Sequence, residues 1–359
     1  MSCRIFDGSL QNRPNDYARF LVAKRPFPGI SVAQRDAPRL PGNDRKVMSV
    51  DLFHQRTLQR TVICRGVGLH SGAEVEMRLA PAPVNHGLVF VRVDLPAKPA
   101  IPVQAQYVVD TSLATTLGHG SVRVGTVEHL LAALSGLGID NLRIELDGPE
   151  VPIMDGSAAP FARMVHEAGI RTQDEAKEFL VIKRTVTVVD GDKYASFSPA
   201  KRFRIDCTID FRHPLISDQQ YTVEFSDRSF VREVAPARTF GFLRDVDKLR
   251  SLGLAQGGSL QNAVVVDDFS ILNPEGLRFP DEFVRHKLLD ALGDVALLGR
   301  PVIGALTAHK TGHALNQRLV AKVLADPNNY EVVRARLRDV TLAELELSDL
   351  AGVLAPSAA

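Results

Sequence analysis

The chain has 359 residues, of which 45% are hydrophobic and 24% charged, and its formal net charge is +1. This composition is typical of a soluble globular protein with at least one full core, and the near-neutral charge argues against nucleic-acid binding by the chain as a whole. The three cysteines form no CxxC pair, which argues against a disulfide framework or a thiolate zinc site. No apolar run approaches the ~20 residues that span a bilayer. We therefore expect a cytoplasmic protein without an integral membrane segment.

The first 47 residues differ from the rest of the chain. They contain nine Lys or Arg, four Asp or Glu and five prolines, and they show no sustained periodicity. We expect either a disordered tail or a start codon assigned upstream of the true one at Met48. A basic tail that docks on acidic lipid or RNA is the functional alternative.

Residues 48–175 predict a first group of strands and helices. Alternating apolar residues on both sides of a glycine-rich hairpin at 66–72 indicate strands, and we expect strands at 62–64, 75–79, 87–93, 122–124 and 141–146. Helices are expected at 127–135, with Thr126 as a possible N-cap, and near 158–168.

Residues 176–350 predict a second group of the same kind. Its expected strands are 179–189, 194–198, 203–210, 263–267 and 301–308, and its expected helices are 245–252, 281–298 and 314–325. Strands followed by helices, occurring twice, favour an α+β fold of two similar domains over one parallel sheet. We place the boundary in the polar run 172–175.

The helix around residues 281–294 carries the most informative pattern. His286, Asp290 and Asp294 recur every four residues and so share one face, while leucines occupy the other. A neutral imidazole and a carboxylate one turn apart can hold a metal ion, and N and O ligands suit Zn²⁺. The alternative is a surface hydrogen-bonded pair.

Two other segments supply candidate partners. Glu128 and His129 begin the helix at 127–135, and His313 follows a glycine where a strand turns into a helix. His129, His286 and Asp290 would complete a His₂-carboxylate set with an open position, as a catalytic zinc requires, although the same set can hold Fe²⁺. A histidine at such a position often has only a structural role, but a carboxylate beside it, Glu128, can serve as a base.

Six motifs, in this order along residues 55–324, resemble the bacterial UDP-3-O-acyl-N-acetylglucosamine deacetylases of lipid A synthesis. They are GVGLHSG at 66–72, TVEHL at 126–130, PIMDGSAAPF at 152–161, ARTFGF at 237–242, FVRHK at 283–287 and GHALN at 312–316. The resemblance implies two α+β domains with the active site between them. The implied reaction removes the N-acetyl group of UDP-3-O-acyl-N-acetylglucosamine with water and releases acetate.

The resemblance also implies a role for each residue at a motif position. His129, His286 and Asp290 would hold one Zn²⁺ per chain, and Glu128 would take a proton from the attacking water. Thr239 would donate to the oxyanion, and His313, oriented by Asp294, would protonate the departing amine. The resemblance also implies substrate contacts at Lys287, Lys310, Lys193, Phe211 and Phe240. The assignments of Lys310, Lys193 and Phe211 are the weaker ones, because only short motifs support them.

Several alternatives stay open at this point. Asp155 is either a group behind the metal ligands or an Asx-turn carboxylate, and His70 is read as structural. The apolar residues of 239–268 would form a passage for the acyl chain or ordinary core. A zinc amidohydrolase acting on another N-acyl sugar is the alternative function, and a metal-stabilised binding protein is a third. The family implies a monomer.

Overall fold

The computed structural model describes residues 53–335 and 354–356. The predicted tail at 1–47 and the end of the predicted second domain, 336–350, lie outside the described residues. Within them the α+β class is confirmed, because helices and strands alternate along the chain without forming one parallel sheet.

The strands are short, and ten of the 21 in the described residues belong to two five-stranded sheets. In chain order they are β1 (His54–Leu58), β2 (Val62–Val67), β3 (Glu74–Pro81), β4 (Leu88–Arg92), β5 (Ala100–Pro102), β6 (Val108–Asp110), β7 (Thr116–His119), β8 (Val122–Val124), β9 (Leu142–Leu146), β10 (Ile170–Ala176), β11 (Glu178–Ile182), β12 (Val186–Asp190), β13 (Lys193–Ser198), β14 (Arg204–Ile209), β15 (Gln219–Glu224), β16 (Phe240–Phe242), β17 (Val264–Val266), β18 (Val302–Ile303), β19 (Ala305–His309), β20 (Tyr330–Ala335) and β21 (Leu354–Pro356).

Helices and short helical turns connect these strands. The α-helices are α2 (Glu128–Gly136), α3 (Ala159–Ala168), α4 (Asp227–Ser229), α5 (Leu243–Ser251), α6 (Glu282–Val295) and α7 (His313–Ala325). The short turns are η3 (Ala105–Tyr107), η4 (Phe230–Val234), η5 (Ala296–Leu298) and η6 (Pro327–Asn329).

The two five-stranded sheets have the same topology. Their strand orders are β2-β3-β9-β4-β5 and β12-β13-β19-β14-β15. In each sheet the only parallel pair joins the central strand to the third strand of its group, β9 with β4 and β19 with β14. A helix precedes and another follows each central strand, α2 and α3 around β9, and α6 and α7 around β19. The two halves therefore repeat one arrangement, as the repeated pattern in the sequence predicted.

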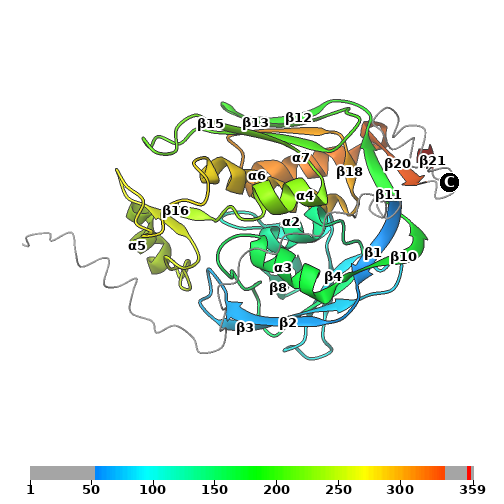
Figure 1. Ribbon diagram of the computed structural model, residues 1–359, viewed down its shortest axis with the longest axis horizontal. Coiled ribbons are helices and arrows are strands. Elements are labelled where there is room, and N and C mark those ends of the chain that lie inside the picture. Colours follow the sequence, from blue (N-terminus) through cyan, green and yellow to red (C-terminus); the bar gives the residue numbers. More distant parts are fainter. Residues whose placement is uncertain (1–52, 336–353, 357–359) are drawn as a thin grey trace, which may run out of the picture. The chain divides into compact units, whose positions relative to one another are not determined.

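Helices α2, α3, α6 and α7 lie between the two sheets (Figure 1). α6 and α7 pack on the second sheet, α3 contacts β2 of the first, and α2 contacts both α3 and α6. Strand β3 buries alternate side chains, Val75, Met77 and Leu79. The α2–α6 contact thus lies in the interior, although the first residues of the two helices, Glu128 and Glu282, are 154 positions apart.

Three local predictions were wrong. The strand expected at 179–189 is two strands, β11 and β12, in different sheets, and the strand expected at 301–308 is divided at Gly304 into β18 and β19. Because a Cβ on Gly304 would lie 2.7 Å from Ile182 Cγ1, the chain can pass from one sheet to the other only with glycine there.

The polar run 172–175, where we placed the domain boundary, lies in β10, which pairs with β1, and the next strand, β11, belongs to another sheet. The boundary itself stays a prediction. The third correction concerns a helix cap. Thr126 does not cap α2: it has φ 55°, the N-cap is Val127, and the Thr126 hydroxyl donates to Glu150.

Helix α6 differs from an ordinary amphipathic helix because its polar face is buried too. Twelve of its 14 residues are buried, including Glu282, His286, Asp290 and Asp294. Buried charges are costly unless they are partnered, so this stripe must find its partners inside the protein. Across the described ranges, no helix has the length and apolar character needed to cross a membrane.

Gly293 permits the close approach of α2 and α6. A Cβ at this position would lie 2.1 Å from the carbonyl oxygen of Glu128 and 2.7 Å from its carbonyl carbon. Both atoms belong to the backbone of α2, so neither can rotate away as a side chain would. The helices cross where only a glycine fits.

We predict that Gly293→Ala destabilises the protein. A glycine-to-alanine substitution in a helix interior normally stabilises a protein by roughly 0.5–1 kcal/mol. Overpacking a close contact costs about 1–3 kcal/mol. A decrease in the free energy of unfolding would therefore show that the contact with α2 outweighs the gain in helix propensity. Urea unfolding measures it. Gly241→Ala is the matched control because a Cβ there meets no atom within 4 Å. A Gly293→Ala protein as stable as the parent would contradict this account of the crossing.

Candidate metal centre

Three buried side chains from α2 and α6 converge at the helix crossing. His129 comes from the first turn of α2, and His286 and Asp290 lie one turn apart on α6. One donor atom of each lies within 4.8 Å of the others. The structure thus brings together the three residues that the sequence predicted as metal ligands.

The distances in this cluster fit a tetrahedral ion. Asp290 Oδ1 lies 3.5 Å from His129 Nε2 and 3.3 Å from His286 Nε2. Ligand atoms about 2.0–2.1 Å from a tetrahedral Zn²⁺ are separated by about 3.3 Å. Asp290 Oδ1 is buried and has no hydrogen-bond partner among the described residues, although a buried carboxylate oxygen normally has one. An ion bound by all three groups would satisfy it.

The protonation of the cluster also suits a metal. Burial lowers the pKa of His286 to about 3, so its ring is neutral, as a ligand must be. Its Nδ1 lies 3.1 Å from the Ala237 carbonyl oxygen, which orients Nε2 toward Asp290. Burial alone would raise the pKa of Asp290, but His286 and Lys287 hold it well below the usual range.

Lys287 lies beside the cluster. Its Nζ donates to Asp290 Oδ2 at 2.7 Å, which leaves Oδ1 facing the two imidazoles. Burial opposes its charge, but Asp290 raises the pKa of Lys287 above its ordinary value. The family resemblance implies a substrate contact for this lysine. The structure places its amine on a ligand, while substrate binding stays a prediction.

A second polar chain adjoins the metal cluster. His313 Nδ1 lies 2.9 Å from Asp294 Oδ2, and its Nε2 lies 3.6 Å from Glu128 Oε1. The Asp294 carboxylate also accepts from Thr115 Oγ1 at 2.6 Å and from Asn316 Nδ2 at 2.8 Å. Glu128, His313 and Asp294, predicted as catalytic residues from three separate segments, are therefore in one line.

The charges along this line are coupled. Burial raises the pKa of Glu128, which brings a carboxylate closer to the range in which it exchanges protons near neutral pH. Burial opposes the charged form of His313, but Asp294 and Glu128 raise its pKa to about 10. His313 is thus a cation at neutral pH, held between two carboxyl groups.

Thr239 lies in the loop just before β16. Its N–H donates to Gly156 O at 2.8 Å and its carbonyl accepts from Val264 N at 2.8 Å. The next residue, Phe240, packs edge-on against the His286 ring at 6.3 Å between centroids. Phe240 therefore adjoins the metal cluster, while the role of the neighbouring Thr239 hydroxyl stays a prediction.

The remaining predicted substrate contacts line one pocket, which adjoins Phe240 through the edge-on contact of the Phe211 ring at 5.6 Å. Lys193, Phe211 and Lys310 line one pocket together with Asp192 and Asp210. Lys310 Nζ lies 3.0 Å from Asp192 and 2.9 Å from Asp210, and these carboxylates raise its pKa. Three residues from different strands and loops thus share a pocket, whereas Lys287 and Phe240 lie at the metal cluster.

Asp155 adopts the Asx-turn alternative. Its Oδ1 accepts from the N–H of Ser157 at 3.0 Å and from the Ser157 hydroxyl at 2.7 Å. Its Oδ2 accepts from Arg278 at 2.9 Å. Among the described residues these bonds reach no metal ligand, so a role for Asp155 behind the ligands stays a prediction.

Glu150 is an important residue that the sequence argument missed. This buried carboxylate accepts from the N–H groups of His70 and Ser71, each at 2.9 Å, and from Thr126 Oγ1 at 2.8 Å. It fastens the glycine hairpin to the residue before α2 and holds Thr126 at a positive φ, which β-branched residues rarely adopt. An acidic residue in an apolar, glycine- and proline-rich loop was the available signal. The backbone contact of His70 agrees with its structural reading.

Comparison with known proteins gives one consistent result. The family model described as UDP-3-O-acyl N-acetylglycosamine deacetylase matches residues 55–325. The chain is 65% identical over 302 residues to UDP-3-O-acyl-N-acetylglucosamine deacetylase of Myxococcus xanthus (strain DK1622). The aligned region covers 84% of this chain and 96% of that protein. The same-named proteins of Anaeromyxobacter sp. (strain Fw109-5) and Hahella chejuensis (strain KCTC 2396) are 58% and 52% identical over 79% of this chain, and over 92% and 94% of their own lengths.

We predict a pH signature of His313 in the metal-free protein. Its pKa is raised from 6.5 to about 10 on folding, so the stability it contributes is complete below pH 6.5 and is lost as the pH rises through 10. Urea unfolding of the parent and His313→Gln, both with chelator, should show a larger difference in unfolding free energy at pH 6 than at pH 10. A constant difference would contradict the charged state assigned to His313.

Proposed function

Because the chain belongs to the family of UDP-3-O-acyl N-acetylglycosamine deacetylases, we propose that it hydrolyses the acetamide of UDP-3-O-acyl-N-acetylglucosamine. The products are acetate and UDP-3-O-acyl-glucosamine, and the reaction is the committed step of lipid A synthesis. The observation that carries the proposal is the three-ligand cluster with the Glu128–His313–Asp294 line beside it. A protein that only binds a metal needs no such line.

His129, His286 and Asp290 hold one Zn²⁺ in this proposal, and Fe²⁺ suits the same donor set. When bound, such an ion would supply a Lewis acid that polarises the amide carbonyl and lowers the pKa of water. Three protein ligands leave a further position for substrate or water, as catalytic zinc sites do. Lys287 neutralises part of the charge on Asp290 through Oδ2.

The protein groups move the protons. Glu128, raised in pKa by burial, takes a proton from the attacking water. His313, a cation paired with Asp294, stabilises the developing oxyanion and then donates its proton to the departing amine. The Thr239 hydroxyl donates to the oxyanion, a contribution of about 3–4 kcal/mol for one well-placed donor.

The substrate spans two further regions. The pocket of Lys193, Phe211 and Lys310 binds the uridine diphosphate: Phe211 stacks on uracil and the lysines pair with phosphate. Lys310 must then exchange Asp192 or Asp210 for a phosphate oxygen, since both carboxylates already contact it.

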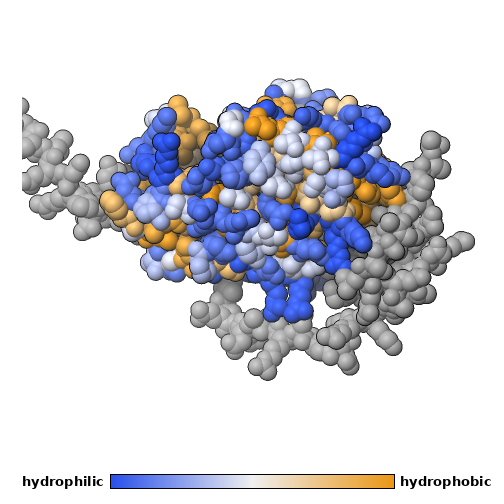
Figure 2. All heavy atoms as spheres, turned by 90° about the horizontal axis from the view of Figure 1, so that it is seen from above, coloured by the Kyte–Doolittle hydropathy of each residue, from blue (hydrophilic) through white to orange (hydrophobic). Residues whose placement is uncertain are grey.

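The acyl chain lies along the segment 239–268. Helix α5 has no buried residue, and Leu252 after it is 64% exposed, so ordinary core packing does not account for its leucines. Within this segment, the Phe242 ring contacts the Phe240 ring, and the Phe240 ring contacts that of His286. Figure 2 shows hydrophobic residues among hydrophilic ones at the left end, where Figure 1 places α5 and β16. We further propose that the protein acts in the cytoplasm as a monomer of two α+β domains, 48–175 and 176–350.

The first test is acetate release from UDP-3-O-acyl-N-acetylglucosamine. We expect activity that disappears when a chelator strips the metal and returns with one Zn²⁺ per chain, since all chemistry depends on that ion. Release of acetate from a simpler N-acyl sugar but not from this substrate would instead favour an amidohydrolase of different specificity. No release from either substrate at any metal loading would overturn the proposal.

Two variants separate metal binding from proton transfer. Glu128→Ala should retain the metal and lose activity by roughly 10²- to 10⁴-fold, the usual contribution of a general base, whereas His286→Ala should lose metal affinity as well. Metal analysis by mass spectrometry, alongside acetate release, distinguishes them. Normal turnover of Glu128→Ala would remove Glu128 as the base, and full metal content of His286→Ala would break the ligand assignment.

A further inference from the structure

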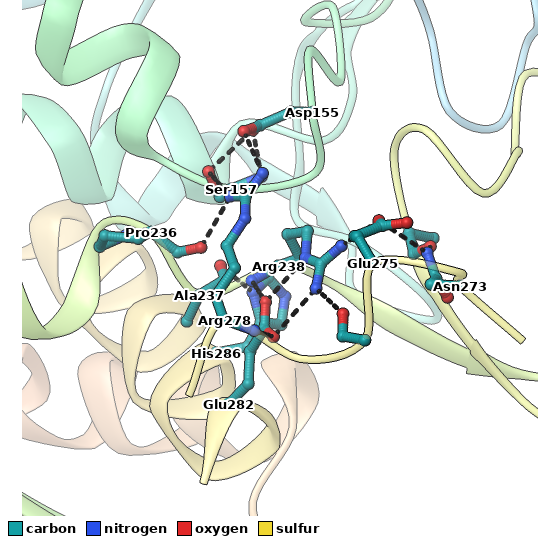
Figure 3. Close-up of polar contacts among 12 residues, drawn as sticks. Asp155, Ser157, Pro236, Ala237, Arg238, Asn273, Glu275, Arg278, Glu282 and His286 are labelled. Carbon is teal, nitrogen blue, oxygen red and sulfur yellow. Dashed lines mark hydrogen bonds and ion pairs between the residues drawn. The ribbon is translucent and has the colours of Figure 1, made fainter. Parts of the chain in front are cut away.

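A buried ion pair lies directly behind the metal cluster. Arg238 donates from its backbone N–H and from Nε to Glu282 Oε1, at 2.9 and 2.8 Å, and from Nη2 to Oε2 at 3.1 Å (Figure 3). The N–H of Arg278 donates to the same Oε2 at 2.6 Å. The Arg238 side chain is 3% exposed and that of Glu282 is fully buried. The proposed function gives neither residue a role.

Glu282 belongs to the same stripe of α6 as the metal ligands. It precedes His286 by four residues, so the two side chains leave the helix on one face. Through Arg238 it grips the backbone of a loop distant in sequence, and it does so one helical turn from a ligand. These hydrogen bonds fix the position of Arg238 along the axis of α6.

One neighbour of Arg238 contacts a metal ligand, and the other is a predicted catalytic residue. The carbonyl of Ala237 lies 3.1 Å from Nδ1 of His286, and Thr239 is the predicted donor to the oxyanion. Pro236 is held as well, because its carbonyl accepts from Arg278 at 2.8 Å. Four consecutive residues, 236–239, are thus each fixed by a partner from another segment.

A buried charge pair is a weak source of net stability, since desolvating two charges offsets most of their attraction. Apolar residues of similar size could fill the same space. A pair that includes a backbone N–H does something that apolar residues cannot: it sets the position of the loop along the helix to within a hydrogen-bond length.

We infer that Glu282 and Arg238 are positioning residues for the metal centre. Their ion pair sets the loop so that the Ala237 carbonyl orients the His286 ring and Thr239 faces the reacting carbonyl. This inference rests on the proposed metal site and deepens it. Groups that orient a ligand histidine typically change metal affinity by about 10- to 100-fold when they are lost.

The test removes both charges at once. Arg238→Met with Glu282→Leu leaves no unpaired buried charge, so the protein should fold. We expect Zn²⁺ affinity, measured by competition with a chromophoric chelator, to fall about 10- to 100-fold. The absorption spectrum of the Co²⁺-loaded double variant should also shift, because that spectrum reports ligand geometry. Metal affinity equal to that of the parent, with an unchanged Co²⁺ spectrum, would overturn the inference.

Glu275→Gln is the matched control. Glu275 also pairs with Arg238, through Nη1 at 2.6 Å, but it is 53% exposed and does not accept from the backbone of residue 238. Its loss removes an ion pair of the same arginine without releasing the loop. We expect parental metal affinity and an unchanged Co²⁺ spectrum, and a loss equal to that of the double variant would also contradict the inference.

A conservative variant covers the case in which the double variant does not fold. Arg238→Lys keeps the charge and the backbone N–H but loses the second side-chain contact to Glu282. It should fold and bind Zn²⁺ with an affinity between those of the parent and the double variant. Parental affinity in a folded Arg238→Lys protein, with an unchanged Co²⁺ spectrum, would count against the inference.

The parent protein separates the two levels of the argument. A parent that binds no metal under these conditions would refute the proposed metal site itself. A parent that binds Zn²⁺, together with variants that bind it equally well, would refute only the positioning role of the ion pair.

Discussion

The structure depends on the close approach of two helices at Gly293. Helix α2 offers its first turn and α6 its polar stripe, and neither alone holds more than part of the candidate centre. A backbone-to-backbone contact is less adjustable than a contact between side chains, because nothing in it can rotate. The two sheets cover the helical layer from outside and exclude water from the crossing. The distances between the three donor atoms are therefore a property of the fold.

The polar stripe of α6 shows how a helix can be buried on every side and still carry charge. Each member has a partner: Glu282 has Arg238, His286 has the Ala237 carbonyl and Asp294 has His313, all from other segments, while Asp290 has Lys287 of the same helix. In a medium of low dielectric these contacts are strong, and an unpaired member would be costly. The hydrogen bonds and ion pairs that partner the buried polar side chains of α6 are therefore also the contacts that arrange the candidate centre.

Much of this was predictable from the sequence, and the remainder was not, for physical reasons. The repeat of His286, Asp290 and Asp294 is local, since a helix alone places them on one face, and the motifs supplied His129 and His313. Long-range pairing is not local. The residues near 182 do not reveal that β11 ends there and that its last residue, Ile182, lies against Gly304, 122 positions later. The positive φ of Thr126 depends on Glu150, which lies 24 residues later, and the grip of Glu282 on residue 238 spans 44 residues.

The repeated strand order of the two sheets has a consequence for assembly of the centre. His129 and His286 lie in the helices that precede corresponding central strands, so each half contributes one part of the ligand set. Were the halves separate molecules, completing the centre would be a bimolecular event, and its yield would vary with the amount of protein in the cell. Joined in one chain, each half meets the other at an effective concentration set by the connection between them. Two copies of one arrangement, held in tandem, make the centre independent of dilution.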